Sequence, residues 1–485
     1  MKKYIYVIIG LLVLTASCKK SELDLFPYDQ IETTQAFNTP ADVTLAVNGM
    51  YAGIRTSGSY YTGTWNILAD ATADNIITNQ DGRGSFRTFA EWRYTGSNTY
   101  GLFSGGYTII RRANAILENI DKFPAGTFHD DAKGQALACR AMVYFDMARV
   151  YAKTYLNATA SDSILPYVTS TDPTITPKKE LVTDFYNKVI ADLNAAIPLI
   201  SDLNVQSPSV KNPNIIRLTK VSTNAILSRV LLYKGDYAGT ISAANAALGT
   251  SYKEVSIANF SKIWTDETDS GVLFKIRNTV LDNNNTLGVN YSQTVGGKIR
   301  AEFTVEYNFY QMFASNDIRK SAYITTGLYN GVLYNDVIKW LIRPGGVTGV
   351  VDGKVIRTAE VLLNRMEAYY RSGNQPAALA DLRILKAARY SGYDPTAENL
   401  SGQALLDEIL LQRRLELAFE GDRFFTLKRL NLPVNRDGTK GERADGSGTP
   451  YVFTTLAAGD YRFQLPYPAL ELSVNPNFGG NNPGY

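Results

Sequence analysis

Two stretches of this chain have the pattern of a helix, a glycine turn and a second helix, and this pattern limits the choice of fold more than any other feature. They are "AILSRVLLYKGDYAGTISAANAAL" (225–248) and "AEVLLNRMEAYYRSGNQPAALADLRILKAAR" (359–389). In both, apolar residues recur at intervals of three and four, which is typical of a helix with one buried face. Gly235 and Gly373 stand where the first helix of each pair should end. We therefore expect helix pairs with tight turns.

Both stretches resemble tetratricopeptide helix pairs, with small residues where the helices cross, an aromatic residue before the turn and glycine at the turn. The separation of Gly235 and Gly373 is far longer than one repeat of about 34 residues, so the chain is not a simple tandem array. Helical spacing also covers 40–54, 105–121 and 130–155, and 176–200, where Pro177 suits a first turn. The sequence thus predicts a mainly α fold, with helix pairs around 130–200, 219–248, 355–390 and 403–430.

The segments between the helices are long and rich in Gly, Asn, Ser and aromatic residues, chiefly around 55–104 and 265–354. Long loops in a compact protein tend to carry function. Two apolar runs within or beside them, 270–278 and 331–342, read as short strands. We expect a loop-rich half that contains a few short strands and carries functional residues.

The composition removes several chemistries. The chain has one histidine, His129, and two cysteines, so a zinc site lacks ligands and a histidine-based triad has only one candidate base. Cys139 lies in an apolar helical run, where a core position is the natural interpretation. The net charge is +3 without a basic block, which argues against nucleic acid as a partner. The acidic residues of 435–450 lack the spacing of a calcium loop, and we expect neither metal nor cofactor.

The first eighteen residues, "MKKYIYVIIGLLVLTASC", have the order of an export signal: lysines, an apolar run, then small residues. The end "LTASC" resembles a bacterial lipoprotein processing site, at which Cys18 would become the lipidated first residue, although Thr15 stands where that pattern usually has Leu. Plain secretion with a free Cys18 is the alternative. We expect a signal peptide at 1–17, a lipidated tether at 18–40 and one intertwined domain at 41–485.

The stretch "RRLELAFEGDRFFTLKRL" (413–430) carries two carboxylates, Glu416 and Glu420, one helical turn apart. Such a pair could serve a retaining glycosidase, in which two carboxyl groups lie about 5–5.5 Å apart. However, Arg413 precedes Glu416 by three residues and Arg423 follows Glu420 by three. Arginines at these positions favour the ionised carboxylates, whereas a glycosidase acid must hold its proton. The pattern favours an ion-paired scaffold, with Gly421 ending the helix and Phe419, Phe424 and Phe425 packed beneath.

The same stretch, "LLQRRLELAFEGDRFFTLKRL", resembles the C-terminal signature of the SusD/RagB family of outer-membrane nutrient-binding lipoproteins. Asp422 stands where that signature has His, and Thr426 where it has Asp. "RRANAILENI", "RAMVYFDMARVY", "SRVLLYKGDY", "RTAEVLLNRMEAYY" and the tail "LPYPALELSVNPNFGGNNPGY" fit the same family in order. The resemblance implies four tetratricopeptide-like helix pairs in a SusD-like superhelix, wrapped by a ligand-binding half.

What the resemblance implies for function is a lipid-anchored protein of the outer membrane, at the cell surface. It would capture an oligosaccharide or another nutrient and pass it to a SusC-like TonB-dependent transporter. A binder of this kind should present aromatic rings to sugar faces, and amides and charged groups to hydroxyls. From loop position and residue type we predict as ligand-binding residues Tyr61, Trp65, Asp74, Arg83, Trp92, Tyr94, Asn98, Tyr100, Tyr291 and Trp340.

Two other functions stay open at this level. One is a glycoside hydrolase that uses Glu416 and Glu420. The other is a helix-pair scaffold whose only partner is a protein. The identity of the ligand, whether glycan or peptide, does not follow from the sequence.

Overall fold

The computed structural model describes residues 36–201, 213–250, 252–281, 286–341 and 343–485. The chain divides after Leu45 into two units. In the first unit, helix α2 (Pro40–Thr56) begins with a reciprocal cap: Asp42 accepts a hydrogen bond from the Thr39 amide (2.7 Å), and Thr39 Oγ1 accepts one from the Asp42 amide (3.3 Å). The predicted signal peptide, Cys18 and nearly all of the tether lie outside the described residues, so these boundaries stay predictions.

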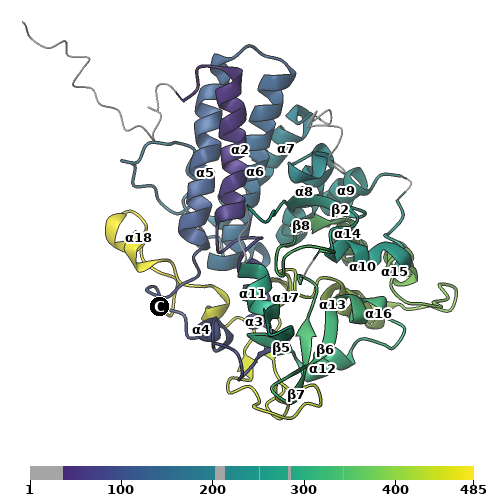
Figure 1. The fold of residues 1–485 in the computed structure, drawn as a ribbon. Coiled ribbons are helices and arrows are strands. Elements are labelled where there is room, and N and C mark those ends of the chain that lie inside the picture. Colours follow the sequence, from purple (N-terminus) through teal and green to yellow (C-terminus); the bar gives the residue numbers. More distant parts are fainter. Residues whose placement is uncertain (1–35, 202–212, 251, 282–285, 342) are drawn as a thin grey trace, which may run out of the picture. The chain divides into compact units, whose positions relative to one another are not determined.

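The second unit, residues 46–485, contains a series of packed helix pairs. The pairs are α6 (Thr127–Tyr151) with α7 (Val182–Leu199), α8 (Lys220–Lys234) with α9 (Tyr237–Leu248), and α14 (Thr358–Arg371) with α15 (Gln375–Ala387). Each pair packs on the next, through α7 on α8 and α9 on α14, and α15 then packs on α16 (Gly402–Glu416). Figure 1 shows α8, α9, α14 and α15 side by side. The predicted mainly α fold with helix pairs is confirmed.

The two turns follow the chemistry that their sequences predict. Gly235 ends α8 with a φ of 80°, and Asp236 then caps α9 by accepting a hydrogen bond from the Gly239 amide (2.8 Å). Gly373 has a φ of 85°, and Asn374 caps α15 in the same way. A positive φ followed by a side-chain cap is what a helix–turn–helix requires of its glycine and its polar residue.

The prediction for the start of the helix at 176–200 is wrong. Pro177 lies before α7, which begins at Val182. The residues before it are extended because they pair with another segment: the Ile164 amide donates to Glu180 O (2.9 Å), and the Glu180 amide donates to Leu165 O (3.1 Å). A proline lies instead near the other end of this helix, at Pro198.

The remaining helical elements lie in the loop-rich segments and elsewhere between the helix pairs. They are α3 (Trp65–Ala71), α4 (Arg87–Ala90), α5 (Leu102–Asn119), α10 (Ile257–Trp264), α11 (Thr286–Ser292), α12 (Tyr307–Gln311), α13 (Ile318–Tyr323), α17 (Arg423–Arg429), α18 (Ala469–Val474), and the 3-10 turns η2 (Ile120–Lys122), η3 (Tyr155–Asn157), η4 (Pro213–Ile216) and η5 (Tyr461–Phe463). Of these, α5 packs along α6 and α10 packs on α13.

Strands are short and occur in antiparallel pairs. The pairs are β1 (Ile76–Thr78) with β5 (Phe303–Val305), β2 (Val272–Ile276) with β8 (Gly353–Arg357), β3 (Gln293–Val295) with β4 (Lys298–Arg300), β6 (Ile324–Tyr329) with β7 (Val332–Val337), and β9 (Val434–Asn435) with β10 (Thr455–Leu456). The predicted strands at 270–278 and 331–342 correspond to β2 and β7. Because β8 runs directly into α14, its pairing with β2 ties a loop-rich segment to the helix pairs.

A large aromatic core lies under the loop-rich segments. Trp264, Tyr323, Trp340 and Phe419 are all at most 2% exposed and belong to one hydrophobic cluster, and successive rings among them lie 5.5–6.5 Å apart. A second cluster fills the space between α14, α15 and α16. The core positions predicted for Trp264 and for Cys139 are confirmed, since Cys139 is fully buried.

Candidate functional site

The charged stretch 413–430 is a buried electrostatic centre. Helix α16 ends at Glu416, and a turn from Leu417 to Gly421 separates it from α17. Glu420 therefore lies in the turn, and the expectation that the two glutamates share one helix face is wrong. The helix ends before Glu420 because Phe419, at a φ of 64°, directs its ring into the aromatic core.

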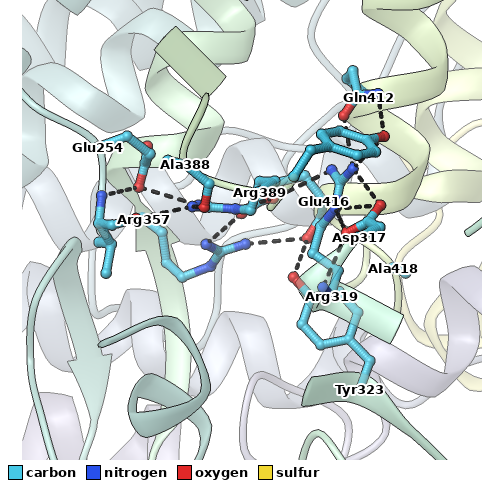
Figure 2. Close-up of polar contacts among 12 residues, drawn as sticks. Glu254, Asp317, Arg319, Tyr323, Arg357, Ala388, Arg389, Gln412, Glu416 and Ala418 are labelled. Atoms are coloured by element: carbon cyan, nitrogen blue, oxygen red, sulfur yellow. Dashed lines mark hydrogen bonds and ion pairs between the residues drawn. The ribbon is translucent and has the colours of Figure 1, made fainter. Parts of the chain in front are cut away.

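Glu416 is fully buried and contacts three guanidinium groups (Figure 2). Arg389 approaches both carboxylate oxygens, with Nε to Oε2 at 2.8 Å and Nη2 to Oε1 at 3.0 Å. Arg357 donates from Nη1 to Oε1 at 3.0 Å, and Arg319 Nη1 lies 3.5 Å from Oε2. Burial alone would raise the pKa of Glu416, but Arg389 and Arg357 outweigh it and hold the pKa well below its ordinary value.

Glu420 belongs to the same network. It accepts hydrogen bonds from Arg357 Nη2 (2.6 Å) and from Lys339 Nζ (2.6 Å). Lys339 is fully buried, and its ammonium also lies 3.7 Å from the centre of the Tyr323 ring. Burial lowers the pKa of Lys339 to about 7, although Glu420 opposes this shift. The carboxylates thus join α16, β8 and the loop after α15 through charge pairs.

The sequence named the wrong arginines for this network. Arg413 pairs with Asp422, at 2.6 Å from Nη2 to Oδ1, and Arg423 pairs with Asp74, at 2.7 Å from Nε to Oδ1. Asp422 makes no side-chain cap for α17, since its carboxylate is held by Arg413 and Thr426. Helical spacing brings side chains near one another, but the long guanidinium arms reach the partners that tertiary packing presents.

As a catalytic pair, Glu416 and Glu420 have the wrong electrostatics. A retaining glycosidase needs one carboxyl group that holds its proton and one that reaches the substrate. The side chain of Glu416 has no exposed area, and its two oxygens already meet cations from three different elements. The arrangement can brace the fold, and it gives no substrate atom access to Glu416.

Most of the predicted ligand-binding residues are inside the protein. Seven aromatic rings and one carboxylate are at most 8% exposed, namely Tyr61, Trp65, Asp74, Trp92, Tyr94, Tyr100, Tyr291 and Trp340. The expectation that these side chains are presented to solvent is wrong. The seven rings have a common reason: each carries a polar atom or a π face that joins segments far apart in the chain. Asp74 is held by Arg423.

Trp92 and Trp340 illustrate this structural use. Trp92 donates from Nε1 to Thr72 O at 2.9 Å, and the Arg436 guanidinium stacks 4.1 Å from its ring centre. Trp340 donates from Nε1 to Phe419 O at 2.9 Å and so fixes the turn that carries Glu420. Residue type and loop position therefore do not separate a binding aromatic from a packing aromatic.

Two members of the predicted set remain at the surface. Arg83 has 42% of its side chain exposed while its Nε contacts Glu302 at 2.5 Å, and Asn98 is exposed in a turn closed by backbone bonds with Thr95. Their contact with a ligand stays a prediction.

Pockets open away from the predicted residues. One of about 330 Å³ lies between the end of α6, α17 and η5 and is lined by Lys153, Lys428 and Gln464 among others. A second, of about 400 Å³, is lined by Arg55, Arg217 and Arg277. A third, of about 310 Å³, is largely apolar and lies beside α5. None of the ten predicted residues lines these pockets, and sequence patterns cannot find them because their walls come from segments far apart in the chain.

In the described ranges, no group of three His, Cys, Asp or Glu residues is placed to hold a metal ion. Within the same part of the chain, no helix combines the length and the apolar character needed to cross a bilayer.

Comparison with known protein families gives two matches along the chain. A SusD-like family described as "Starch-binding associating with outer membrane" matches residues 23–232, and the SusD family (SusD/RagB) matches residues 342–485. The chain belongs to the SusD/RagB family.

Individual relatives agree with that assignment. SusD-like protein P2 of Formosa agariphila is 26% identical, with both chains covered completely. A putative sugar-binding protein of Bacteroides vulgatus has the same fold, with a TM-score of 0.79 at 24% identity over 93% of this chain and 99% of the other. Surface glycan-binding protein A of Bacteroides fluxus is similar at a TM-score of 0.69 and 19% identity, over 92% of this chain and all of the other. At these identities the structural likeness establishes the fold.

Proposed function

We propose that this protein is a glycan-binding lipoprotein of the outer membrane, anchored through Cys18 at the cell surface, which delivers its ligand to a SusC-like TonB-dependent transporter. The observation that carries the binding role is the match to a family described as starch-binding and associated with the outer membrane, over residues 23–232. The names of the Bacteroides vulgatus and Bacteroides fluxus proteins, a putative sugar-binding protein and a surface glycan-binding protein, support the same ligand class.

The proposal includes a non-catalytic role. It is supported by the state of Glu416, whose buried carboxylate is neutralised by Arg389 and Arg357 and therefore has no proton to give to a glycosidic oxygen. The second role considered, a scaffold for protein partners alone, has no such observation in its favour.

The test is a binding screen with the mature protein. Affinity electrophoresis against polysaccharides, followed by calorimetry with the oligosaccharides that respond, should reveal saturable binding without release of reducing sugar. Asn98→Ala and Arg83→Ala should weaken binding if the loop-rich half holds the ligand, and Asn187→Ala, an exposed asparagine on α7, is the matched control. Silence across the whole panel would reject the proposal, and so would sugar release that Glu416→Gln abolishes.

The transporter step has its own test. Co-purification of the lipidated protein with an outer-membrane TonB-dependent transporter is expected. Purification of the protein alone from gently solubilised outer membranes would count against this step.

A further inference from the structure

The pocket between the end of α6, α17 and η5 contains a buried lysine, Lys428, that has no carboxylate partner among the described residues. This lysine lies on α17, is 4% exposed, and lines the pocket of about 330 Å³. Its Nζ donates one hydrogen bond, to Arg149 O at 2.7 Å. Among the residues that the structure describes, no carboxylate lies within ion-pair distance of it.

Other buried lysines of the described chain have what Lys428 lacks. Lys275 pairs with Asp269 at 2.6 Å, Lys339 with Glu420 at 2.6 Å, and Lys354 with Asp266 at 2.5 Å. An ammonium taken out of water without a counter-charge is costly, and proteins normally place a carboxylate beside it. Lys428 is therefore the exception that needs an explanation.

Capping of α6 explains only part of this. Arg149 is in the last turn of α6, where a cation is favourable beside the unsatisfied carbonyl groups. A neutral donor is enough for that purpose: the neighbouring carbonyl of Val150 accepts from the Leu465 amide at 3.1 Å, and that of Tyr151 accepts from Asn482 Nδ2 at 2.6 Å. One carbonyl also leaves the two other hydrogens of the ammonium without an acceptor in the described residues.

The pocket wall has the composition of a sugar site with one charged position. The side-chain amides of Asn431 and Gln464 line it and make no hydrogen bond to a described residue, so both can serve hydroxyl groups. Leu432, which is 40% exposed, supplies an apolar surface of the kind on which a sugar ring packs, whereas Phe463 is 1% exposed and stacks on Phe424 beneath it. None of the lining residues is acidic, and the volume lies at the low end of the roughly 300–1,000 Å³ of small-molecule sites, which suits one sugar unit.

Lys153, the second lysine of the wall, differs from Lys428. Its Nζ contacts both carboxylate oxygens of Asp162, at 2.9 and 3.0 Å, so its charge is already balanced. In the described structure the pocket therefore has one lysine amine without a counter-charge, Lys428, at its buried end.

From this geometry we infer that the pocket binds a uronic acid unit, with the sugar carboxylate on Lys428 Nζ and the ring against Leu432. The inference rests on the proposed function and narrows the ligand class to acidic glycans. It agrees with the titration of the amine: burial first, and then the nearby Arg149 guanidinium, lower the pKa of Lys428 well below its ordinary value. A bound carboxylate supplies the missing counter-charge and restores the cation.

The test compares the affinity for a charged sugar with the affinity for its neutral analogue. Calorimetry or saturation-transfer NMR on the mature wild-type protein should give at least about ten-fold tighter binding of methyl glucuronide than of methyl glucoside, because a hydrogen-bonded charge pair is worth more than one factor of ten. Lys428→Met should abolish this preference and leave the urea midpoint unchanged or higher, since the variant removes a buried amine that has no counter-charge among the described residues. Lys153→Met is the matched control and should change the preference by less than about three-fold, because its partner already neutralises it.

Several outcomes would overturn the inference. Equal affinity for the two methyl glycosides in the wild type would do so without any variant, and this comparison stands even if Lys428→Met fails to fold. Acetate or sulfate bound as tightly as methyl glucuronide would reduce the pocket to a small-anion site. If polysaccharides bind but the glucuronide does not compete and Lys428→Met is inert, the inference fails while the proposed function stands. If methyl glucuronide binds and no glycan of the panel does, the proposed function fails and the pocket assignment stands.

Discussion

Replacing Glu416 by glutamine perturbs the ion network at its centre. The variant keeps the size of the side chain and removes the one negative charge that Arg389, Arg357 and Arg319 share. Breaking a buried pair by removing one partner typically costs about 3–5 kcal/mol, because it leaves an uncompensated buried charge.

The expected cost for this protein is at the low end of that range. Each of the three arginines retains a second carboxylate: Arg389 keeps Glu254 at 3.1 Å, Arg357 keeps Glu420 at 2.6 Å, and Arg319 keeps Asp317 at 2.7 Å. Because Lys339 shares Glu420 with Arg357, four cations then face three carboxylates, and one positive charge is left unbalanced rather than three. We expect Glu416→Gln to lower the free energy of unfolding by about 3 kcal/mol.

The assay is urea denaturation followed by fluorescence, with the free energy taken from the midpoint and an unchanged slope. Glu180→Gln is the matched control, since it breaks a surface pair with Lys188 (2.6 Å) whose partners are partly exposed and should cost less than about 1 kcal/mol. A loss in Glu416→Gln no larger than in the control would refute the scaffold argument. Loss of a hydrolytic activity at unchanged stability would point to the catalytic reading instead.

Three further predictions concern acid stability, a close contact and the surface loop. Burial raises the pKa of Asp74, but its two arginine partners outweigh burial and lower the pKa to about 2. The ionised Asp74 therefore stabilises the folded protein by about 2 kcal/mol above about pH 4, and this contribution is lost as the pH falls toward 2. Asp74→Asn should flatten the curve of stability against pH in this range. Gly421→Ala should lower the free energy of unfolding in urea by about 3 kcal/mol or more, because a Cβ at this position, with its φ of 84°, would lie 2.4 Å from Trp65 Nε1. Gly373→Ala is the control: its φ is 85° but the space around it is open, so it should cost about 1 kcal/mol. Equal losses in the two variants would contradict the close-contact argument. Asn98→Ala should keep the urea midpoint within about 0.5 kcal/mol and act only on ligand affinity, and a large loss of stability would remove this exposed residue from the candidate site.

The helix pairs were predictable because their determinants are local. Gly235 and Gly373 each stand directly before the residue that caps the next helix, and the periodicity of the flanking helices is visible in neighbouring positions of the sequence. The start of α7 was not predictable from Pro177, since the residues ahead of it are held extended by pairing with Ile164 and Leu165.

The sequence predicted that the site is ion-paired, but it did not predict which residues form the pairs. Ion pairing of Glu416 was expected, but its arginines come from β8 and from the loop after α15, 59 and 27 positions away. The same limit applies to the aromatic residues, because Trp92 and Trp340 satisfy long-range carbonyls that no local pattern reveals. Lys428 shows the limit most clearly: its significance is the absence of a carboxylate in the surrounding described structure, which depends on what every neighbouring segment brings.

The central claim, that this protein captures glycans without cleaving them, is tested most directly by titrating the wild-type protein calorimetrically with oligosaccharides that contain uronic acid. The account predicts heats that saturate with the sites and then return to the baseline of dilution. A steady heat that continues after each injection, as an enzyme consumes its substrate, would contradict it.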